Sequence, residues 1–188
     1  THPFASDRFV VVAAPNHPLA NRRSVRFEEV MGLDFVGLDR ASAEREGDAF
    51  DRHLADPATL YVAIAGEMAV MLPTAGAGHD AAIFLPAERL AGEAVSERVF
   101  LGRRADGAPV VGALLAVARG QELKDDPAYL VSDLRSVATH GLVPTDQIGT
   151  LAQAKSLLLW HARRRFCANC GARTEAAQAG QRRDCPGC

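Results

Sequence analysis

The last 22 residues contain two Cys-x-x-Cys pairs, and this feature restricts the possible fold more than any other. Cys167 and Cys170 form the first pair, and Cys185 and Cys188 form the second, with 14 residues between the pairs. Zinc prefers four sulfur or nitrogen ligands at the corners of a tetrahedron, and a two-residue spacer lets one tight turn direct two thiolates at the same ion. The pattern therefore predicts a zinc ribbon whose intervening residues form a short hairpin that turns near Gly180.

The cysteines also bear on the kind of metal site and on the cellular compartment. Four cysteines complete a tetrahedron, so we expect a structural rather than a catalytic Zn2+ on Cys167, Cys170, Cys185 and Cys188. A thioredoxin-like redox pair is an alternative, but it would need only one Cys-x-x-Cys near a βαβ pattern; chance is another. The 166 residues before Cys167 contain no cysteine. This distribution argues against a disulfide framework and favours the cytoplasm, a reducing compartment.

The composition is that of an ordinary globular protein. Hydrophobic residues make up 48% of the 188 residues and charged residues 23%, which suits one domain or one domain with a small module. The net charge of -2 gives no general reason to expect nucleic acid or an anionic membrane as a partner. No apolar run reaches the roughly 18 residues of a membrane span, and no secretory signal is visible. Because the chain begins with Thr1, we expect its true start to lie upstream.

Basic residues and one histidine surround the cysteines. The basic residues are six arginines, which could contact phosphates, although a solvated surface is the simpler interpretation. They are Arg163, Arg164, Arg165, Arg173, Arg182 and Arg183. His161 could be mistaken for a further metal ligand. Because the sulfur set is already complete, we expect His161 to be packed or hydrogen bonded instead.

Helices are expected before the cysteines, and strands before the helices. Apolar residues recur at helical spacing over residues 145–165 and again over 126–141, where Asp126 would cap the helix. Upstream, "LYVAIAG" and "EMAVML" can pair across Gly66, "AAIFL" follows, and "ERVFLGRR" and "PVVGALLAVA" flank the turn signal "ADGA". The expected fold class is α+β, with a small strand-rich N-terminal domain and two helices followed by a four-cysteine zinc ribbon.

Several segments resemble the NADH pyrophosphatases (NAD+ diphosphatases) of the Nudix superfamily. They are "FLGRRADGAPVVGALL", "DLRS", "AKSLLLWHARRRFCANCGA" and the closing "CPGC". The resemblance runs from about Leu38 to Cys188. It implies a strand-rich N-terminal domain and a four-cysteine zinc ribbon, which in this family precede the catalytic domain.

The resemblance implies hydrolysis of the pyrophosphate of NADH or NAD+ to nicotinamide mononucleotide and AMP. Bacterial members are also associated with removal of NAD caps from RNA. The family uses Mg2+ or Mn2+, held by glutamates of the Nudix box, to assist attack of water on phosphorus. The box G-x5-E-x7-R-E-U-x-E-E-x-G-U is absent from this sequence. The chain is therefore expected to be a fragment of a hydrolase that is inactive alone.

Single residues can be carried over from this family. The four cysteines match its zinc ligands. Arg135, in "DLRS", matches an arginine that contacts substrate, and a guanidinium would suit a pyrophosphate; a surface helix arginine is the alternative. The implied partners are NAD(H), NAD-capped RNA and a second copy of the chain in a homodimer, with no membrane.

The first residues resemble a different family. "FASDRFVVVAAPNHPLANRRSVRFEEVMGLDFVGLDRAS" is similar to part of the effector-binding domain of LysR-type transcription regulators. The segment is either a regulator fragment joined to a pyrophosphatase fragment or a divergent start with an accidental likeness. An effector domain needs roughly 200 residues to bury its sheets, so about forty residues cannot rebuild one.

The sequence thus predicts four regions without a catalytic Nudix domain. They are a foreign-looking LysR-like segment (1–38), a Nudix-associated N-terminal domain (39–143), a connecting helix (144–166) and a truncated zinc ribbon (167–188). The leading hypothesis is an NAD(H) diphosphatase fragment. A stand-alone zinc-ribbon module that binds nucleic acid or protein is the alternative, and a transcription regulator is the third.

Overall fold

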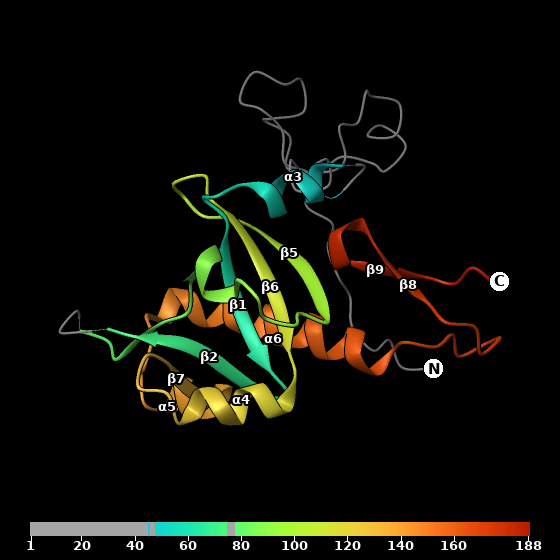
Figure 1. Ribbon diagram of the computed structural model, residues 1–188. Helices are drawn as coiled ribbons and strands as arrows, with labels where there is room; N and C mark the ends of the chain where they lie inside the picture. The colour runs from blue at the N-terminus through green and yellow to red at the C-terminus, as the bar shows by residue number, and fades with distance from the viewer. Residues whose placement is uncertain (1–44, 46–47, 75–77) are drawn as a thin grey trace, which may run out of the picture. The chain divides into compact units, whose positions relative to one another are not determined.

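A seven-stranded mixed sheet lies at the centre of the part of the chain that the computed structural model describes, which is residues 45, 48–74 and 78–188 (Figure 1). These residues belong to one unit, Arg40–Cys188. The segment expected to be LysR-like, 1–38, lies outside the described residues. The strands are β1 (Leu60–Ala65), β2 (Met68–Pro73), β3 (Ala81–Ala82), β4 (Leu85–Pro86), β5 (Glu97–Arg103), β6 (Pro109–Leu115) and β7 (Leu130–Asp133).

The sheet is built from two predicted hairpins joined side by side. β1 and β2 pair antiparallel across Gly66, whose φ of 61° is the left-handed conformation that such a turn requires. β5 and β6 pair antiparallel across the predicted Asp-Gly turn. β1 and β6 then pair in parallel, which gives the order β3-β2-β1-β6-β5; β4 also pairs with β1, and β7 with β2. Both hairpin predictions are confirmed, and the α+β class is correct.

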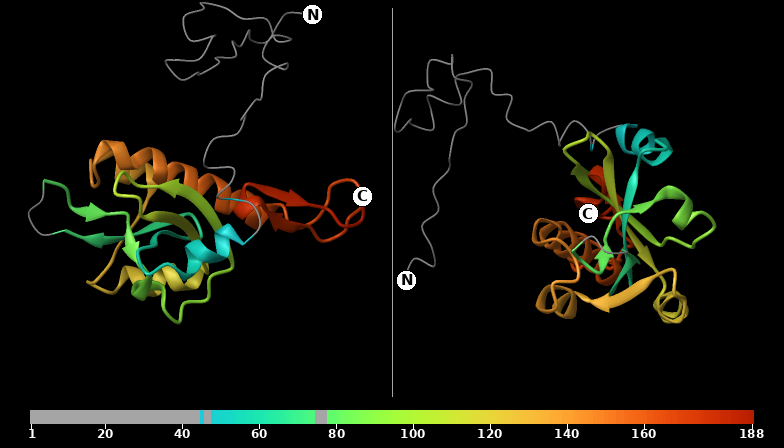
Figure 2. Two further views of the ribbon diagram at one scale, coloured as in Figure 1. Left: turned by 90° about the horizontal axis from the view of Figure 1, so that it is seen from above. Right: turned by 90° about the vertical axis from the view of Figure 1, so that its left-hand side faces the viewer.

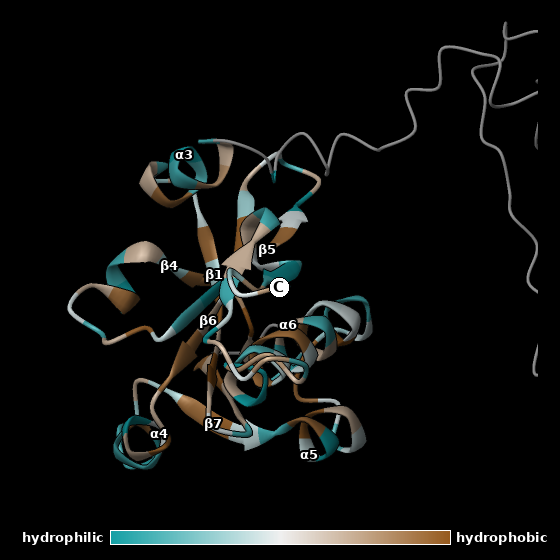
Figure 3. Cartoon of the chain, turned by 90° about the vertical axis from the view of Figure 1, so that its right-hand side faces the viewer, coloured by the Kyte–Doolittle hydropathy of each residue, from teal (hydrophilic) through white to brown (hydrophobic). Residues whose placement is uncertain are grey.

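Successive side chains of a strand point to opposite faces of the sheet, and both faces of this sheet are buried. The central strands are accordingly coloured mainly as hydrophobic in Figure 3. In β1, Val62 and Ile64 face a core that includes Leu151, Ala154 and Leu158. The alternate residues of β1 face the opposite core with Phe100, Leu123 and Ala179. Because both faces are covered, β1 is apolar throughout rather than alternating.

Four α-helices occur among the described residues, and they cover both faces of the sheet (Figure 2). They are α3 (Ala49–Ala55), α4 (Val117–Lys124), α5 (Leu134–Thr139) and α6 (Thr145–Arg163). The predicted helix over 145–165 is confirmed as α6. None of the helices in the described ranges has the length and apolar character needed to cross a membrane.

The predicted helix over 126–141 is wrong. Residues Leu130–Asp133 form β7, which pairs with β2, and only Leu134–Thr139 are helical. Asp133 caps this helix, since its carboxylate accepts a hydrogen bond from the backbone N–H of Ser136 (3.0 Å). Pairing with an exposed edge of the sheet outweighs the helical spacing of three apolar residues.

The cysteine-bearing segment forms a small antiparallel hairpin after α6. Strands β8 (Glu175–Ala177) and β9 (Arg182–Asp184) are joined by the 3-10 turn η2 (Gln178–Gly180), so the predicted turn near Gly180 is confirmed. The turn packs against β5. A Cβ at Gly180 would lie 2.5 Å from Cγ1 of Val99, so only glycine permits this approach.

Candidate functional site

The four cysteines come together at the open end of the β8–β9 hairpin. Their Sγ atoms all lie within 4.8 Å of one another, with contacts of 3.3 Å (Cys170–Cys185), 3.5 Å (Cys185–Cys188) and 3.6 Å (Cys167–Cys188). Four thiolates placed about 2.3 Å from one zinc ion at tetrahedral corners would be about 3.8 Å apart. The arrangement therefore fits one zinc ion, and zinc binding itself stays a prediction.

The first cysteine pair lies on a tight turn that directs hydrogen-bond donors at its sulfurs. The backbone N–H of Gly171 donates to the carbonyl of Cys167 (2.9 Å), and Gly171 has a φ of 75°. The N–H groups of Cys170 and Asn169 favour the Cys167 thiolate and lower its pKa to about 6. Asn169 also favours the Cys188 thiolate, but the neighbouring thiols outweigh it and raise the pKa of Cys188 to about 12. Cysteine binds a metal as the thiolate, so metal binding at this cluster would release the thiol protons.

A buried polar group fastens the hairpin to α6 and β5. His161 is fully buried; its Nε2 lies 2.7 Å from the carbonyl oxygen of Gly180, and its Nδ1 lies 2.7 Å from Nη1 of Arg183. A carbonyl only accepts and a guanidinium only donates, so His161 carries its hydrogen on Nε2. Arg183 also lies 3.5 Å from the carboxylate of Glu97 and donates to Thr174. The expectation that His161 is packed and hydrogen bonded, not a metal ligand, is confirmed.

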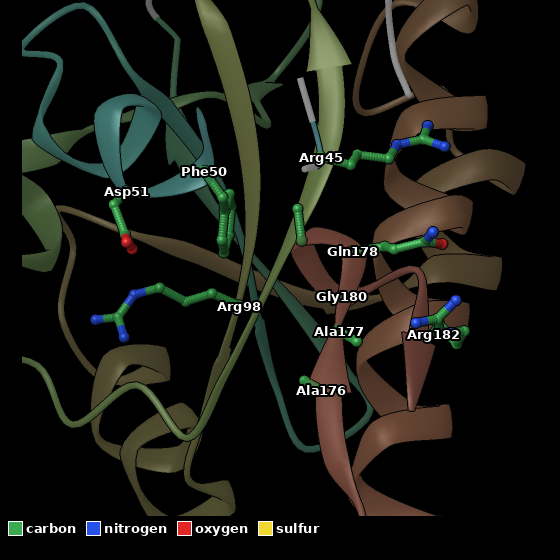
Figure 4. A pocket seen from close by; sticks show the side chains of 10 residues that line it. Arg45, Phe50, Asp51, Arg98, Ala176, Ala177, Gln178, Gly180 and Arg182 are labelled. Carbon is green, nitrogen blue, oxygen red and sulfur yellow. The ribbon is translucent and has the colours of Figure 1, made fainter. Parts of the chain in front are cut away.

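A cavity of about 500 Å³ lies between α3, β5 and the hairpin. Its lining residues are Arg45, Phe50, Asp51, Arg98, Ala176, Ala177, Gln178, Ala179, Gly180 and Arg182. In Figure 4 Phe50 lies at the centre, Arg98 extends to one side, and Arg45, Gln178 and Arg182 extend to the other. Neither Arg45 nor Arg98 has an ion-pair partner in the described part of the chain, whereas Arg182 pairs with Asp184 at 2.7 Å. The cavity thus has an apolar middle and a cationic rim.

The turn that lines this cavity has an unusual backbone. Gln178 and Ala179 have φ values of 50° and 52°, a conformation that residues with a Cβ seldom adopt. The turn is held by its neighbours: Nε2 of Gln181 donates to the carbonyl of Phe100 (2.7 Å), in addition to the His161 contact with Gly180. Strain of this kind persists where surrounding contacts fix the backbone, and it is concentrated at functional sites.

Arg135 lies apart from both the cysteines and the cavity. It is on the exposed side of α5, which follows β7, and it does not line the cavity.

Among the arginines near the cysteines, Arg183 is not part of a solvated surface, because it is largely covered and bonded to His161 and Thr174. No local pattern predicts this burial, since His161 and Glu97 are remote from Arg183 along the chain.

Comparison with family models finds a match to the LysR substrate-binding domain over residues 1–121, more than half of the chain. The chain belongs to this family. The match includes β1 to β6, so the likeness to LysR proteins is not confined to residues 1–38, as was expected from the sequence. The cysteine hairpin, α5 and α6 follow the matched range.

This membership overturns the assignment to the Nudix superfamily. No match to a Nudix or NADH pyrophosphatase family was found, so the NAD+ diphosphatase assignment and the description as a hydrolase fragment are wrong. The resemblance depended mainly on a short pattern around four cysteines. Such patterns report a metal site and can occur on unrelated folds, so they identify neither fold nor activity.

Two predicted partners, NAD(H) and NAD-capped RNA, and one predicted cofactor are withdrawn with that assignment, whereas the predicted homodimer stays a prediction. LysR membership gives no basis for NAD(H) or NAD-capped RNA as a partner, and Mg2+ or Mn2+ was expected only for the Nudix domain. The substrate-contacting role predicted for Arg135 rested on the same resemblance and loses that basis. The stand-alone zinc-ribbon module is also replaced, because the matched range is the larger part of the chain.

Proposed function

We propose that this chain is the effector-binding part of a LysR-type transcriptional regulator, and that a small molecule binds in the cavity between α3, β5 and the cysteine hairpin. The match to the LysR substrate-binding domain over residues 1–121 carries the effector-binding part of this proposal. The location of the ligand rests on the cavity itself, because the hairpin residues that line it follow the matched range. Small-molecule sites are typically cavities of about 300–1,000 Å³, lined by apolar surface and a few polar groups. The cavity at Phe50 has a volume of about 500 Å³, which lies in this range, and it is open to solvent with a lining that is more polar than apolar.

The rim of the cavity indicates the chemistry of the ligand. Three arginines and one aspartate line it, so positive charge exceeds negative charge by two among the lining side chains. Guanidinium groups bind carboxylates and phosphates through paired hydrogen bonds. A ligand with a compact apolar body and an acidic group would match both the middle and the rim.

We further propose that the C-terminal hairpin is a zinc ribbon held by a structural Zn2+ on the four cysteines. The hairpin has three-residue strands and buries little apolar surface, chiefly Ala179, so it cannot gain much stability from a core of its own. Bound metal commonly supplies that stability in small modules. Metal analysis should find one zinc per chain, and none after Cys170→Ser and Cys185→Ser are combined. Zinc that persists in this double variant would reject the site. The four cysteines form no disulfide, and this suits a reducing compartment such as the cytoplasm.

Thermal unfolding in the presence of single compounds tests the effector-binding proposal. The panel would contain succinate, citrate, phosphate, glutamine, phenylalanine and adenosine at equal ionic strength. A ligand at about 100 times its Kd stabilises a protein by about 2.7 kcal/mol, which corresponds to a rise in Tm of several degrees for a chain of this size. At least one compound should produce a saturable rise. If none does at millimolar concentration, the proposal is rejected.

A further inference from the structure

We propose that the four cysteines are an oxidation site, at which a peroxide converts them to two disulfides, Cys170–Cys185 and Cys167–Cys188, and expels the metal. The inference deepens the proposed function, because the cysteines close the base of the hairpin whose turn lines the ligand cavity. It rests on the proposed zinc only for the release of metal. The disulfide pairing follows from the arrangement of the sulfurs alone.

Accessibility is the first observation that supports this site. Cys170 and Cys188 are exposed, and Cys167 and Cys185 are half-buried. None of the four cysteines is buried, and exposure together with thiolate character is what makes cysteine susceptible to oxidation.

The sulfur distances select the pairing between the two Cys-x-x-Cys motifs. A disulfide requires the sulfurs to approach to about 2.05 Å. The pairing across the hairpin uses two contacts, 3.3 Å for Cys170–Cys185 and 3.6 Å for Cys167–Cys188. Pairing within each motif has one comparable contact among the described residues, 3.5 Å for Cys185–Cys188. Only in the pairing of Cys170 with Cys185 and of Cys167 with Cys188 do both prospective disulfides start from sulfurs in short contact.

The chemistry balances with two equivalents of hydrogen peroxide. In each half, one thiolate attacks a peroxide oxygen, the O–O bond breaks, and a sulfenic acid forms with release of hydroxide. The partner thiolate then attacks the sulfenic sulfur, the S–S bond forms, and a second hydroxide leaves. Each pair of cysteines loses two electrons to one peroxide, and two protons from solvent convert the hydroxides to water. The disulfide sulfurs are no longer anionic, so Zn2+ leaves as a hydrated ion.

The pairing has a consequence for the ligand cavity. Disulfides across the hairpin join the segment before β8 to the segment after β9, as the metal does. The contacts of the turn with His161 and Phe100 are remote from the sulfurs and stay in place. The oxidised chain therefore keeps the wall of the cavity. The reduced, metal-free chain has neither the disulfides nor the metal to hold the base of the hairpin. Oxidation is thus expected to release zinc while ligand binding is retained.

Peptide mapping after oxidation tests the pairing directly. Cleavage after arginine places the first pair in FCANCGAR (166–173) and the second in DCPGC (184–188). The zinc-loaded chain would be treated with two equivalents of hydrogen peroxide, with zinc release followed by a metal-binding dye. We expect the two peptides to be joined by two disulfides, with up to one zinc released per chain. Separate peptides, each with an internal disulfide, or peptides with sulfinic acid only, would overturn the proposal.

Two double variants distinguish the two possible pairings across the hairpin. Cys167→Ser with Cys188→Ser leaves the sulfurs that are 3.3 Å apart, and it should cross-link readily. Cys167→Ser with Cys185→Ser leaves Cys170 and Cys188, and it should cross-link at least about tenfold more slowly, since closure rate depends on which sulfurs can meet. Equal rates would contradict the assignment. A chain purified without zinc would reject the proposed metal site, while the peptide map would still decide the oxidation site.

Discussion

The Nε2 atom of His161 lies 2.7 Å from the carbonyl oxygen of Gly180, and this hydrogen bond joins α6 to the turn of the cysteine hairpin. The same imidazole accepts a hydrogen bond from Arg183, which follows the turn on β9. One buried side chain thus holds both the turn that lines the ligand cavity and the strand that leads to Cys185 and Cys188. The cavity wall and the metal site are supported by a common anchor.

Replacement of His161 should therefore destabilise the chain. The substitution His161→Ala leaves the Gly180 carbonyl and the Arg183 guanidinium without their partner and opens a cavity, at a cost of about 2–3 kcal/mol. Urea unfolding would measure the loss. His140→Ala is a matched control, because His140 is exposed and its Nδ1 contacts only a carbonyl of its own helix. Equal effects of the two substitutions would contradict the anchor.

Two glycine substitutions should change stability in opposite directions. Gly180 has a φ of 86°, and a Cβ there would lie 2.5 Å from Val99, so Gly180→Ala should cost about 3 kcal/mol. Gly149 is exposed on α6, and a Cβ there would meet nothing within 4 Å. Gly149→Ala should therefore stabilise the chain by about 1 kcal/mol. Denaturant midpoints of both variants check this, and a neutral Gly180→Ala would show that the turn does not pack against β5.

The cap of α5 should make part of the stability depend on pH. The side chain and the backbone N–H of Ser136 bind the Asp133 carboxylate and lower its pKa. Because the folded pKa is depressed, the stabilisation is present above the unfolded value of about 4 and is lost as the pH falls through the folded pKa. Asp133→Ala should lower Tm by a few degrees at about pH 7 and at about pH 5. The difference from the unsubstituted chain should shrink below about pH 4, and a constant difference would exclude a role for the charge.

Local signals in the sequence were sufficient for several elements. The turns at Gly66 and at the Asp106-Gly107 pair have the residue types that tight hairpins need, and both hairpins form. The apolar spacing over α6 is long enough to identify a helix. The doubled Cys-x-x-Cys pattern places its four sulfurs within 4.8 Å of one another.

Other features depend on contacts that no local pattern reveals. β7 looks helical by spacing, but its pairing with β2 decides its conformation. Glu97 and Arg183 are 86 positions apart in the sequence and meet only because the hairpin packs on β5. The cavity likewise combines α3, β5 and the hairpin turn, so its residues could not be assembled from motifs. The predicted family is wrong for a related reason: a short metal-binding pattern can occur on unrelated folds, whereas the LysR match spans the strands β1 to β6.

A titration of the zinc-loaded chain followed by amide chemical shifts tests most directly whether a small molecule binds in the cavity. Each compound of the ligand panel would be added to isotope-labelled protein at constant ionic strength. We predict saturable shifts for at least one acidic compound, concentrated at Phe50, Arg98 and Ala177–Gly180. The amide of Arg135, on the exposed side of α5, should not move. Saturable shifts centred on α5, or no saturable shifts with any compound, would contradict binding in this cavity.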